Sequence, residues 1–370
     1  MTDLLFSPFR LGPLTLGNRI VCLPMYLAYP EPDHEVNDLV LEYYSTLAGS
    51  GAGLVVVENC TVEARGLTNP RTLLISGDHF LPGLARLAET IKAHGVPAVL
   101  QLHHAGRHAK RDDSVAPSAL PTWGFTPKAM DAGDIRAVVA AFAAGATRAR
   151  AAGFDGVELH GGMGYLLTQF LSARTNLRED RYGGDLEGRM RFPLEVVAAV
   201  RDAVGDGFPV GYRFLADECV EGGVTLDETR PFAVELARAG VTYLSVMVGC
   251  YDSPLQYVVD DRRHGFMAPF AAAVKEVVPA TPVIAAGRIQ HPATARAILA
   301  DGAADLVGLG RVAFADPLWP KKARGDLDEP INECAPSCSL CMKRLVEQRP
   351  AYCARWTRER RERFVERVGG

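Results

Sequence analysis

The sequence lacks long hydrophobic runs, and this absence limits where the protein is expected to act. No apolar stretch reaches the roughly 18 residues that a membrane-spanning helix needs. The opening segment, MTDLLFSPFRLG, has an early acidic residue and no hydrophobic core, so no signal peptide is predicted. We therefore expect a cytoplasmic protein that does not associate with membranes.

Lysine is also scarce, with 7 lysines beside 33 arginines and 44 acidic residues, for a formal net charge of −4. The arginines are scattered and the overall balance is acidic, so a nucleic-acid-binding face is not expected. The apolar fraction of 48% is ample for a folded core, and no repeat stands out. These features exclude disordered and fibrous proteins.

The 370 residues do contain a regular alternation of short apolar runs and longer amphipathic stretches. Continuous apolar strands separated by helices are typical of a parallel sheet that is covered on its outside. No G-x-G-x-x-G follows an early strand, which disfavours a doubly wound dinucleotide-binding sheet. The eight predicted strands are Arg19–Pro24, Gly53–Val57, Pro97–Leu102, Gly156–His160, Pro209–Leu215, Tyr243–Val248, Pro282–Ala286 and Asp305–Leu309.

Eight such units predict an α/β fold of the (β/α)8 TIM barrel type over residues 1–325. A cysteine-rich C-terminal extension over residues 326–370 follows, where the alternation stops. Three long insertions, His104–Asp134, Gly161–Asp185 and Gly249–Gly265, each follow a strand. Barrel enzymes place their active sites on that face, so we expect these loops to shape a substrate pocket.

The seventh and eighth strands each end in a Gly-Arg pair, Gly287-Arg288 and Gly310-Arg311. Glycines let backbone N–H groups approach an anion, and arginines can hold phosphate oxygens in a fork. Two copies on adjacent strands favour a phosphate site at this edge of the barrel. The alternative is that the glycines only turn each strand into its helix and the arginines are solvated.

A polar amide and a cation, Gln101 and Arg213, stand at or near the ends of the third and fifth strands. Such groups need partners when they are buried. A flavin ring would supply partners, with a cation stabilising the anionic reduced ring. An internal pair between Arg213 and a carboxylate, either Asp217 or Glu58, is the equally weighted alternative.

The fourth strand leads to His160 and Tyr165 at the predicted barrel mouth. Histidine can hold a substrate carbonyl, and tyrosine can deliver a proton to carbon. A purely structural hydrogen-bonding role remains open for a single histidine at a strand end.

The extension carries four cysteines with the spacing C-x3-C-x2-C-x11-C. Clustered cysteines in a cytosolic chain indicate a metal site rather than disulfides. An iron–sulfur cluster, a structural zinc ion and free buried thiols are the three readings of this set. The residues are Cys334, Cys338, Cys341 and Cys353.

Several motifs occur in an order that resembles the old yellow enzyme family of FMN oxidoreductases, over nearly the whole chain. The similarity is greatest to the branch that includes 2,4-dienoyl-CoA reductase and trimethylamine dehydrogenase. The motifs are LFSPFRLGPLTLGNRI, LPMYLAYP, VVVENCTVEARG, QLHHAGR, APSALP, the block that matches GYLLxQFLSxxxNxRxDxYGG, and finally GRI followed by GLGR.

The resemblance implies FMN as cofactor, with Tyr165 as proton donor and His160 as the first residue of a carbonyl clamp. It also implies a 4Fe-4S cluster at the four cysteines, although the two short spacings are swapped here. The implied FMN contacts are Pro24, Met25, Tyr26, Asn59, Gln101, Arg213, Gly287, Arg288, Gly310 and Arg311.

Three departures from the family pattern are apparent. Met163 stands where the second clamp residue is expected, and methionine cannot donate a hydrogen bond. Tyr26 stands where many relatives use Thr or Cys. The sequence ends at Gly370, without the nucleotide-binding half of the long relatives, so we expect electrons from NAD(P)H directly or from a separate electron-transfer protein.

The leading functional prediction is an FMN-dependent ene-reductase that moves a hydride to an activated C=C bond of a small-molecule substrate. The alternative is an FMN and iron–sulfur dehydrogenase that oxidises an amine and passes electrons to a partner protein. A lyase barrel would want a Schiff-base lysine at a strand end, and none stands there. A non-catalytic electron-transfer subunit would leave His160 and Tyr165 unexplained. A homo-oligomer is expected.

Overall fold

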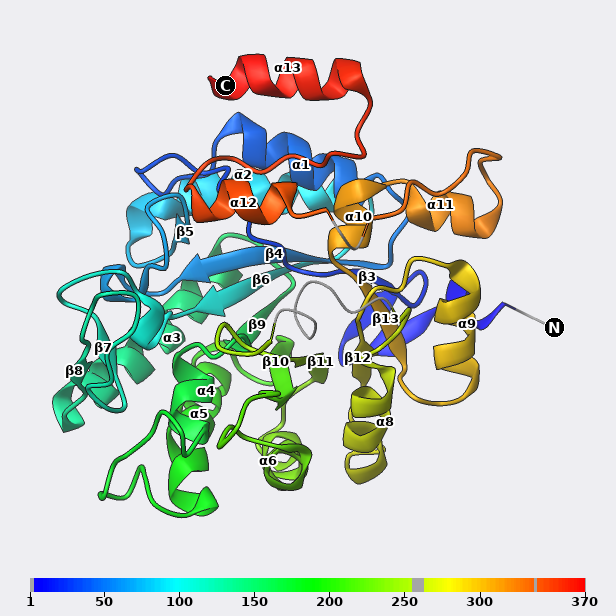
Figure 1. Ribbon diagram of the computed structural model, residues 1–370. Coiled ribbons are helices and arrows are strands. Elements are labelled where there is room, and N and C mark those ends of the chain that lie inside the picture. The colour runs from blue at the N-terminus through cyan, green and yellow to red at the C-terminus, as the bar shows by residue number, and fades with distance from the viewer. Residues whose placement is uncertain (1–2, 255–262, 336–337, 370) are drawn as a thin grey trace.

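The computed structural model describes residues 3–254, 263–335 and 338–369. Its central feature is a closed ring of parallel strands (Figure 1), in which the last strand pairs with the first and the first with the second. The ring confirms the predicted (β/α)8 barrel and all eight predicted strands. They are β3 (Ile20–Cys22), β4 (Leu54–Thr61), β6 (Ala98–His103), β9 (Gly156–Gly161), β10 (Val210–Asp217), β11 (Tyr243–Val248), β12 (Val283–Ala285) and β13 (Leu306–Leu309).

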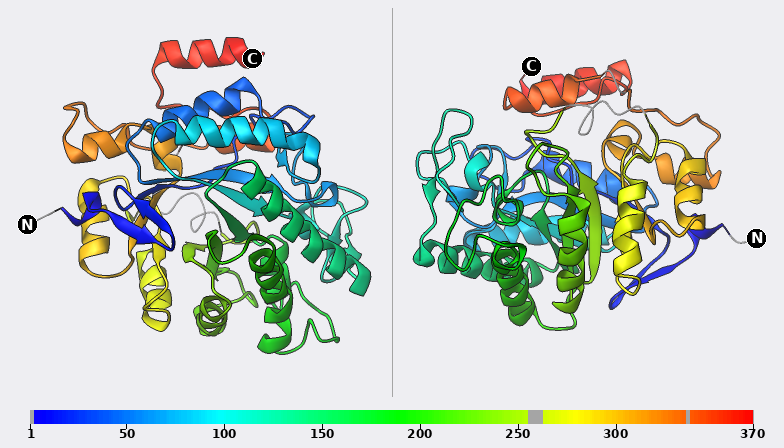
Figure 2. Two further views of the ribbon diagram at one scale, coloured as in Figure 1. Left: turned by 180° about the vertical axis from the view of Figure 1, so that it is seen from behind. Right: turned by 60° about the horizontal axis from the view of Figure 1, so that its bottom comes forward.

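Helices cover the outside of this ring, as the views in Figure 2 show. They follow the strands along the chain, except that α11 comes directly after α10, and their buried hydrophobic residues belong to the main hydrophobic core. A short strand, β5 (Leu73–Leu74), extends the pairing of β4 outside the ring. The helices are α1 (Asp38–Ala48), α2 (Leu81–Lys92), α3 (Ala132–Ala151), α5 (Leu186–Val204), α6 (Leu226–Arg238), α8 (Ala268–Val277), α9 (Pro292–Ala300), α10 (Arg311–Ala315) and α11 (Trp319–Arg324).

An N-terminal hairpin that the sequence analysis did not predict closes the amino-terminal end of the barrel. It consists of the antiparallel strands β1 (Phe9–Leu11) and β2 (Leu14–Leu16). Leu11 and Leu16 are fully buried in one cluster with inward side chains of the barrel strands. The apolar interior at this end leaves the opposite, carboxyl-terminal end for polar groups.

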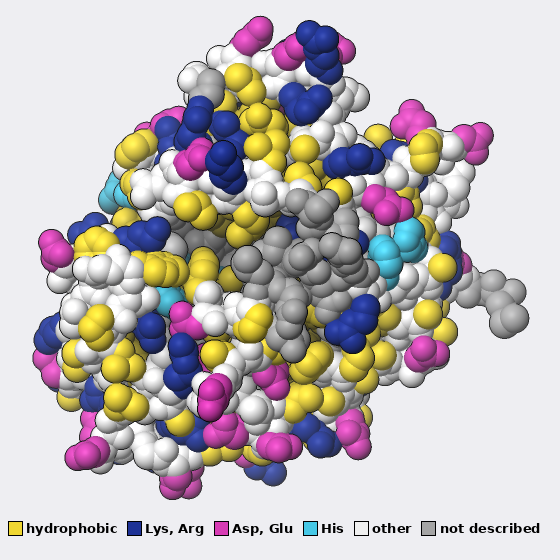
Figure 3. Space-filling model, viewed as in Figure 1, with side chains coloured by type: hydrophobic (Ala, Val, Ile, Leu, Met, Phe, Trp, Pro, Cys, Tyr) yellow, Lys and Arg dark blue, Asp and Glu magenta, His cyan; other side chains and the backbone are white. Residues whose placement is uncertain are grey.

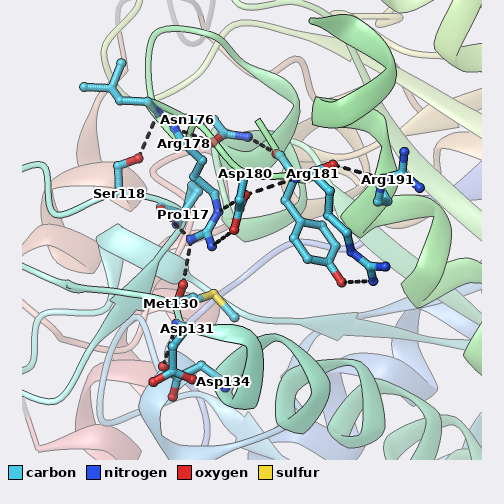
Figure 4. A network of polar contacts seen from close by, with 12 residues as sticks. Pro117, Ser118, Met130, Asp131, Asp134, Asn176, Arg178, Asp180, Arg181 and Arg191 are labelled. Atoms are coloured by element: carbon cyan, nitrogen blue, oxygen red, sulfur yellow. Dashed lines mark hydrogen bonds and ion pairs between the residues drawn. The ribbon is translucent and has the colours of Figure 1, made fainter. Parts of the chain in front are cut away.

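The two inserted segments that follow β6 and β9 brace each other at the barrel mouth (Figure 4). Arg178 donates from Nη1 to the carbonyl oxygens of Pro117, at 3.0 Å, and Met130, at 2.6 Å, and it also pairs with Asp180. The backbone N–H of Leu177 donates to Ser118 Oγ at 2.8 Å. The insertions contain the short pair β7 (Val115–Ala116) and β8 (Lys128–Ala129) and the helix α4 (Leu166–Leu171).

The C-terminal extension packs on the barrel over α1 and α10, at the top of Figure 1. Its helices are α12 (Leu340–Val346) and α13 (Arg358–Val368). Trp356 Nε1 donates to the Phe314 carbonyl at 2.8 Å, and the Phe364 ring lies 5.6 Å from that of Tyr29. The arginine-rich helix after the last cysteine therefore packs on the barrel through Phe364, its one buried residue.

No helix among the described residues is both long enough and apolar enough to span a membrane.

A buried ion pair anchors the start of the extension, and its removal gives a test of the fold. Lys322 Nζ lies 2.8 Å from Asp316 Oδ2, which also accepts the Asn332 N–H at 2.7 Å. Replacing Lys322 with Met leaves the buried carboxylate uncompensated, so the free energy of unfolding should fall by about 3 kcal/mol. Chemical denaturation followed by circular dichroism measures the change. Lys321→Met is the control, and an equal loss in that variant would contradict the role of the pair.

Candidate active site at the carboxyl ends of the strands

A cavity opens at the carboxyl-terminal ends of the barrel strands, as (β/α)8 enzymes require. Hydrophobic side chains gather around the hollow on this face (Figure 3). Met163, Met247 and Phe266 contribute apolar parts of its wall. Seven of the ten FMN contacts implied by the resemblance also line it, and they are Pro24, Met25, Arg213, Gly287, Arg288, Gly310 and Arg311.

At one end of the cavity, the chain turns sharply after β12. Gly287 and Arg288 both have left-handed backbone angles, with φ of +97° and +54°. A Cβ atom at Gly287 would lie 2.8 Å from the Met267 backbone nitrogen, so this glycine is needed for the turn itself. A Cβ atom at Gly310 would meet nothing within 4 Å. The open space beside Gly310, between Arg288 and Arg311, is where an anion can approach the backbone.

Deeper in the barrel, three polar side chains from the neighbouring strands β6, β9 and β10 form a buried group. Gln101 Nε2 donates to Glu158 Oε1 at 2.7 Å, and Arg213 Nη1 donates to Ser245 Oγ at 2.7 Å. Burial lowers the pKa of Arg213, and the negative charge of Glu158 opposes that shift. The carboxylate that acts on Arg213 is therefore Glu158, and neither candidate considered from the sequence has this role.

Three other FMN contacts implied by the resemblance, Tyr26, Asn59 and Gln101, are not among the described residues that line the cavity, and neither are His160 and Tyr165. Asn59 is 8% exposed on β4. The Tyr26 hydroxyl is enclosed and has no partner among the described residues. Beside Asn59, burial raises the pKa of Glu58 to about 8, so this carboxyl is largely neutral at pH 7.

His160 stands at the end of β9, directly beside Arg213 in the strand register. Its ring is nearly buried, and burial together with the positive charge of Arg213 lowers its pKa to about 3. The Gly162 N–H donates to His160 Nδ1 at 3.3 Å. An accepting ring nitrogen carries no proton, so neutral His160 has its proton on Nε2 and can donate from there.

Tyr165 lies next to His160, with ring centroids 4.9 Å apart in an edge-to-face arrangement. Burial raises the pKa of Tyr165 well above its ordinary value, so the phenol keeps its proton at neutral pH. Its hydroxyl lies 2.6 Å from that of Tyr251, which follows β11. The site thus brings together two neutral side chains that can each donate a hydrogen bond or a proton.

Sequence reasoning did not single out Tyr251, because nothing local in the sequence relates it to Tyr165, 86 residues earlier. The neighbouring Asp252 fixes this segment by an ion pair of 2.7 Å with Arg174 and a longer one, 3.8 Å, with Arg107. Part of the predicted pocket-shaping loop Gly249–Gly265, residues 255–262, lies outside the described residues.

Polar side chains in the segment after β9 support the loop around Tyr165 and do not line the cavity. Gln169 Nε2 donates to the carbonyl oxygens of Gly164, at 2.7 Å, and Ala105, at 3.0 Å. Asn176 Nδ2 donates to the carbonyl oxygen of Phe170 at 2.6 Å. These hydrogen bonds therefore fix the loop conformation that positions Tyr165.

In the extension, burial raises the pKa of the Cys334, Cys341 and Cys353 thiols. The pKa of Cys353 rises to about 11, and the other three thiols add to the shift. Cys334 also lines the cavity, beside Arg311. Among the described residues, however, no three His, Cys, Asp or Glu side chains are assembled as ligands of one metal ion.

The closed barrel, with a cavity at its mouth that is lined by arginines as well as apolar side chains, defines a (β/α)8 protein of the enzyme type. A family profile for the NADH:flavin oxidoreductase / NADH oxidase family matches residues 4–329. The chain belongs to this family, as its resemblance to old yellow enzyme predicted.

Curated relatives agree with this assignment. The chain is 41% identical to a metal reductase of Desulforamulus reducens and 40% identical to an NADH oxidase of Thermoanaerobacter brockii. These alignments cover 95% and 91% of the chain, but it spans only about half, 53%, of each relative. An NADPH dehydrogenase of Geobacillus sp. is 38% identical, and the alignment covers 90% of the chain and 97% of that relative.

Solved structures give the same picture. A 2-naphthoyl-CoA reductase superimposes with a TM-score of 0.91 at 27% identity, over 95% of this chain and 57% of that one. Histamine dehydrogenase from Rhizobium sp. 4-9 gives 0.85 at 29%, over 95% and 52%. Morphinone reductase gives 0.75 at 31%, over 90% and 93%. These proteins include reductases and an amine dehydrogenase, so the fold leaves the reaction open.

The state of His160 can be tested directly. Because its pKa is lowered to about 3, the ring should stay neutral, with the proton on Nε2, between about pH 5 and pH 8. Nitrogen chemical shifts of histidine-labelled protein report the tautomer and the charge, and His160→Gln identifies the signal. A titration midpoint near the ordinary value of about 6.5 would contradict the buried, neutral donor.

Proposed function

We propose that this protein is an FMN-dependent reductase of small molecules that contain an activated C=C bond. The observation that carries the proposal is the pair of neutral donors, His160 and Tyr165, held 4.9 Å apart at the barrel mouth. His160 Nε2–H would polarise the substrate carbonyl, and Tyr165 would protonate the α-carbon. Bound FMN, once reduced, would supply the hydride for the β-carbon.

The cavity supports FMN as the cofactor by the chemistry of its lining. Arg288, Arg311 and the open backbone at Gly310 suit a single phosphate group. Arg213 on the cavity wall, together with the buried Gln101 on β6, suits the polar edge of the flavin ring, and the apolar wall at Met25 suits its faces. NADH or NADPH is the proposed electron donor, in keeping with the names of the relatives.

A second candidate is oxidation of an amine, with electrons passed to a partner protein. The favouring observation is an aromatic wall in which the Trp123 and Tyr251 rings lie 5.0 Å apart. Lys110 Nζ lies 5.0 Å from the Trp123 ring centroid, so this face already accepts a cation. Against the candidate, Met163 cannot donate a hydrogen bond, and its sulfur is only a weak acceptor for a substrate amine.

The main proposal is tested by replacing Tyr165 with Phe in FMN-reconstituted protein. Without the phenol, reduction of an activated alkene such as 2-cyclohexen-1-one by prereduced enzyme should slow by about 10²–10⁴-fold. Flavin reduction by NADH or NADPH should change little, because that step needs no proton from Tyr165. Anaerobic stopped-flow absorbance at the flavin band separates the two half-reactions.

Tyr182→Phe provides the matched control, since its hydroxyl bonds to Glu195 away from the cavity. Wild-type protein that binds no FMN would overturn the proposal. Reduction of the flavin by an amine but not by either nicotinamide would favour the second candidate.

We also propose that Cys334, Cys338, Cys341 and Cys353 hold a 4Fe-4S cluster, with zinc as the alternative. Four thiols in one segment are a suitable donor set for either metal. The Arg355 N–H donates to Cys353 Sγ at 3.4 Å, a contact of the kind that tunes cluster thiolates. Cys334 borders the proposed FMN cavity, so the two centres would be neighbours.

Metal analysis of anaerobically isolated protein tests this second site. We expect about four irons per chain. Cys341→Ser should lose the iron and keep FMN, because the barrel supplies the proposed flavin contacts. Cys219→Ser, which changes a cysteine outside the extension, should keep both. Stoichiometric zinc without iron would contradict the cluster and would identify the four cysteines as a structural zinc site.

A further inference from the structure

Glu158 lies between the two side chains proposed to face the flavin ring. Strand β9 pairs with β6 on one side and with β10 on the other. Gln101 is the register partner of Glu158, and Arg213 is the partner of His160, two residues further along β9. Residues two apart on a strand share a face, so Glu158 lies on the same inward face as His160, one layer deeper.

The contact between Glu158 and Gln101 fixes which way the amide of Gln101 points. A carboxylate only accepts hydrogen bonds, so the amide nitrogen must face Glu158, at 2.7 Å. The amide oxygen is then directed away from Glu158 as an acceptor. Gln101 Oε1 is not among the fully enclosed unpartnered atoms, whereas Glu158 Oε2 is.

The negative charge of Glu158 is opposed by one positive charge inside the barrel. Its side chain is fully buried, and Arg213 is the cation that acts on it. Burial raises the pKa of Glu158, and Arg213 opposes this shift. Tyr243 from β11 is the other titratable side chain beside the carboxylate. Arg213 lines the cavity, so the net charge of Arg213 and Glu158 together affects the electrostatic potential inside it.

We propose that Glu158 is a positioning residue for the flavin ring. Glu158 holds the Gln101 amide so that the Gln101 oxygen would accept a hydrogen bond from the ring N3–H. Glu158 also partly balances the positive charge that Arg213 presents to the ring. This inference rests on the proposed FMN site and extends it to a residue below the cofactor. Glu158 acts through its two neighbours and takes no part in bond making or breaking.

Two substitutions separate the two roles. Glu158→Gln keeps the length but removes the charge, so the midpoint potential of bound FMN should rise, because Arg213 is no longer balanced. Glu158→Asp keeps the charge but is too short to hold Gln101, so its midpoint potential should stay near that of wild type. In both variants the dissociation constant for FMN should rise about tenfold, because the Gln101 amide is free to turn. Spectroelectrochemical titration and flavin fluorescence measure the two quantities.

A double-mutant cycle distinguishes this role from general support of the fold. In a Gln101→Ala background, Glu158→Asp should weaken FMN binding no further, because the amide it positions is absent. Glu218→Gln is the matched control, since Glu218 is a buried carboxylate bonded to Ser172 and to the Val224 N–H instead. It should change neither the potential nor the affinity.

Additive losses in the cycle, or a wild-type potential in Glu158→Gln, would overturn the inference while leaving FMN binding intact. If Glu158→Gln does not fold, the affinity and potential of Glu158→Asp still decide the case, because unchanged affinity there refutes the hold on Gln101. Failure of wild-type protein to bind FMN would instead reject the proposed function.

Discussion

Burial of a positive charge inside the barrel is the constraint on which the candidate site depends. Arg213 lies on a strand in the middle of the ring, where desolvation disfavours its charged form. The parallel register places His160 and Ser245 opposite Arg213 on the flanking strands, and Glu158 lies two residues before His160 on the same face of β9. The closed ring sets the pairing register of every strand. The positions of these polar side chains therefore follow from the barrel as a whole.

The same register explains how polar and apolar layers share one barrel. The hairpin β1–β2 seals the amino-terminal end with Leu11 and Leu16. Polar side chains are confined to the other end, where loops from β6, β9 and β11 converge. Arg178 and Asp252 join these loops by hydrogen bonds and ion pairs. The mouth is thus braced by contacts between loops, and the donors His160 and Tyr165 sit on a rigid frame.

The sequence predicted the barrel well because each buried parallel strand is a continuous apolar run of its own. It located the cavity because Gly-Arg pairs and polar side chains mark the strand ends. Glu158 was missed although a signal existed, since it lies two residues before His160 and must share its face. Tyr251 carries no such signal, because its partnership with Tyr165 arises only when separate loops meet. The hairpin was missed because its two short strands pair antiparallel with each other and stand outside the strand–helix alternation that identified the barrel.

The extension is tied to the cavity through one short stretch of chain. Helix α10 starts at Arg311, on the cavity wall, and Phe314 within it accepts the indole N–H of Trp356 in the extension. Asp316, just after α10, is bound both to Lys322 and to the backbone of Asn332, two residues before Cys334. A shift of α10 would therefore move Arg311 and the cysteine segment together. The proposed phosphate contact and the proposed cluster ligands depend on a single structural element, which places the two sites in a fixed relation.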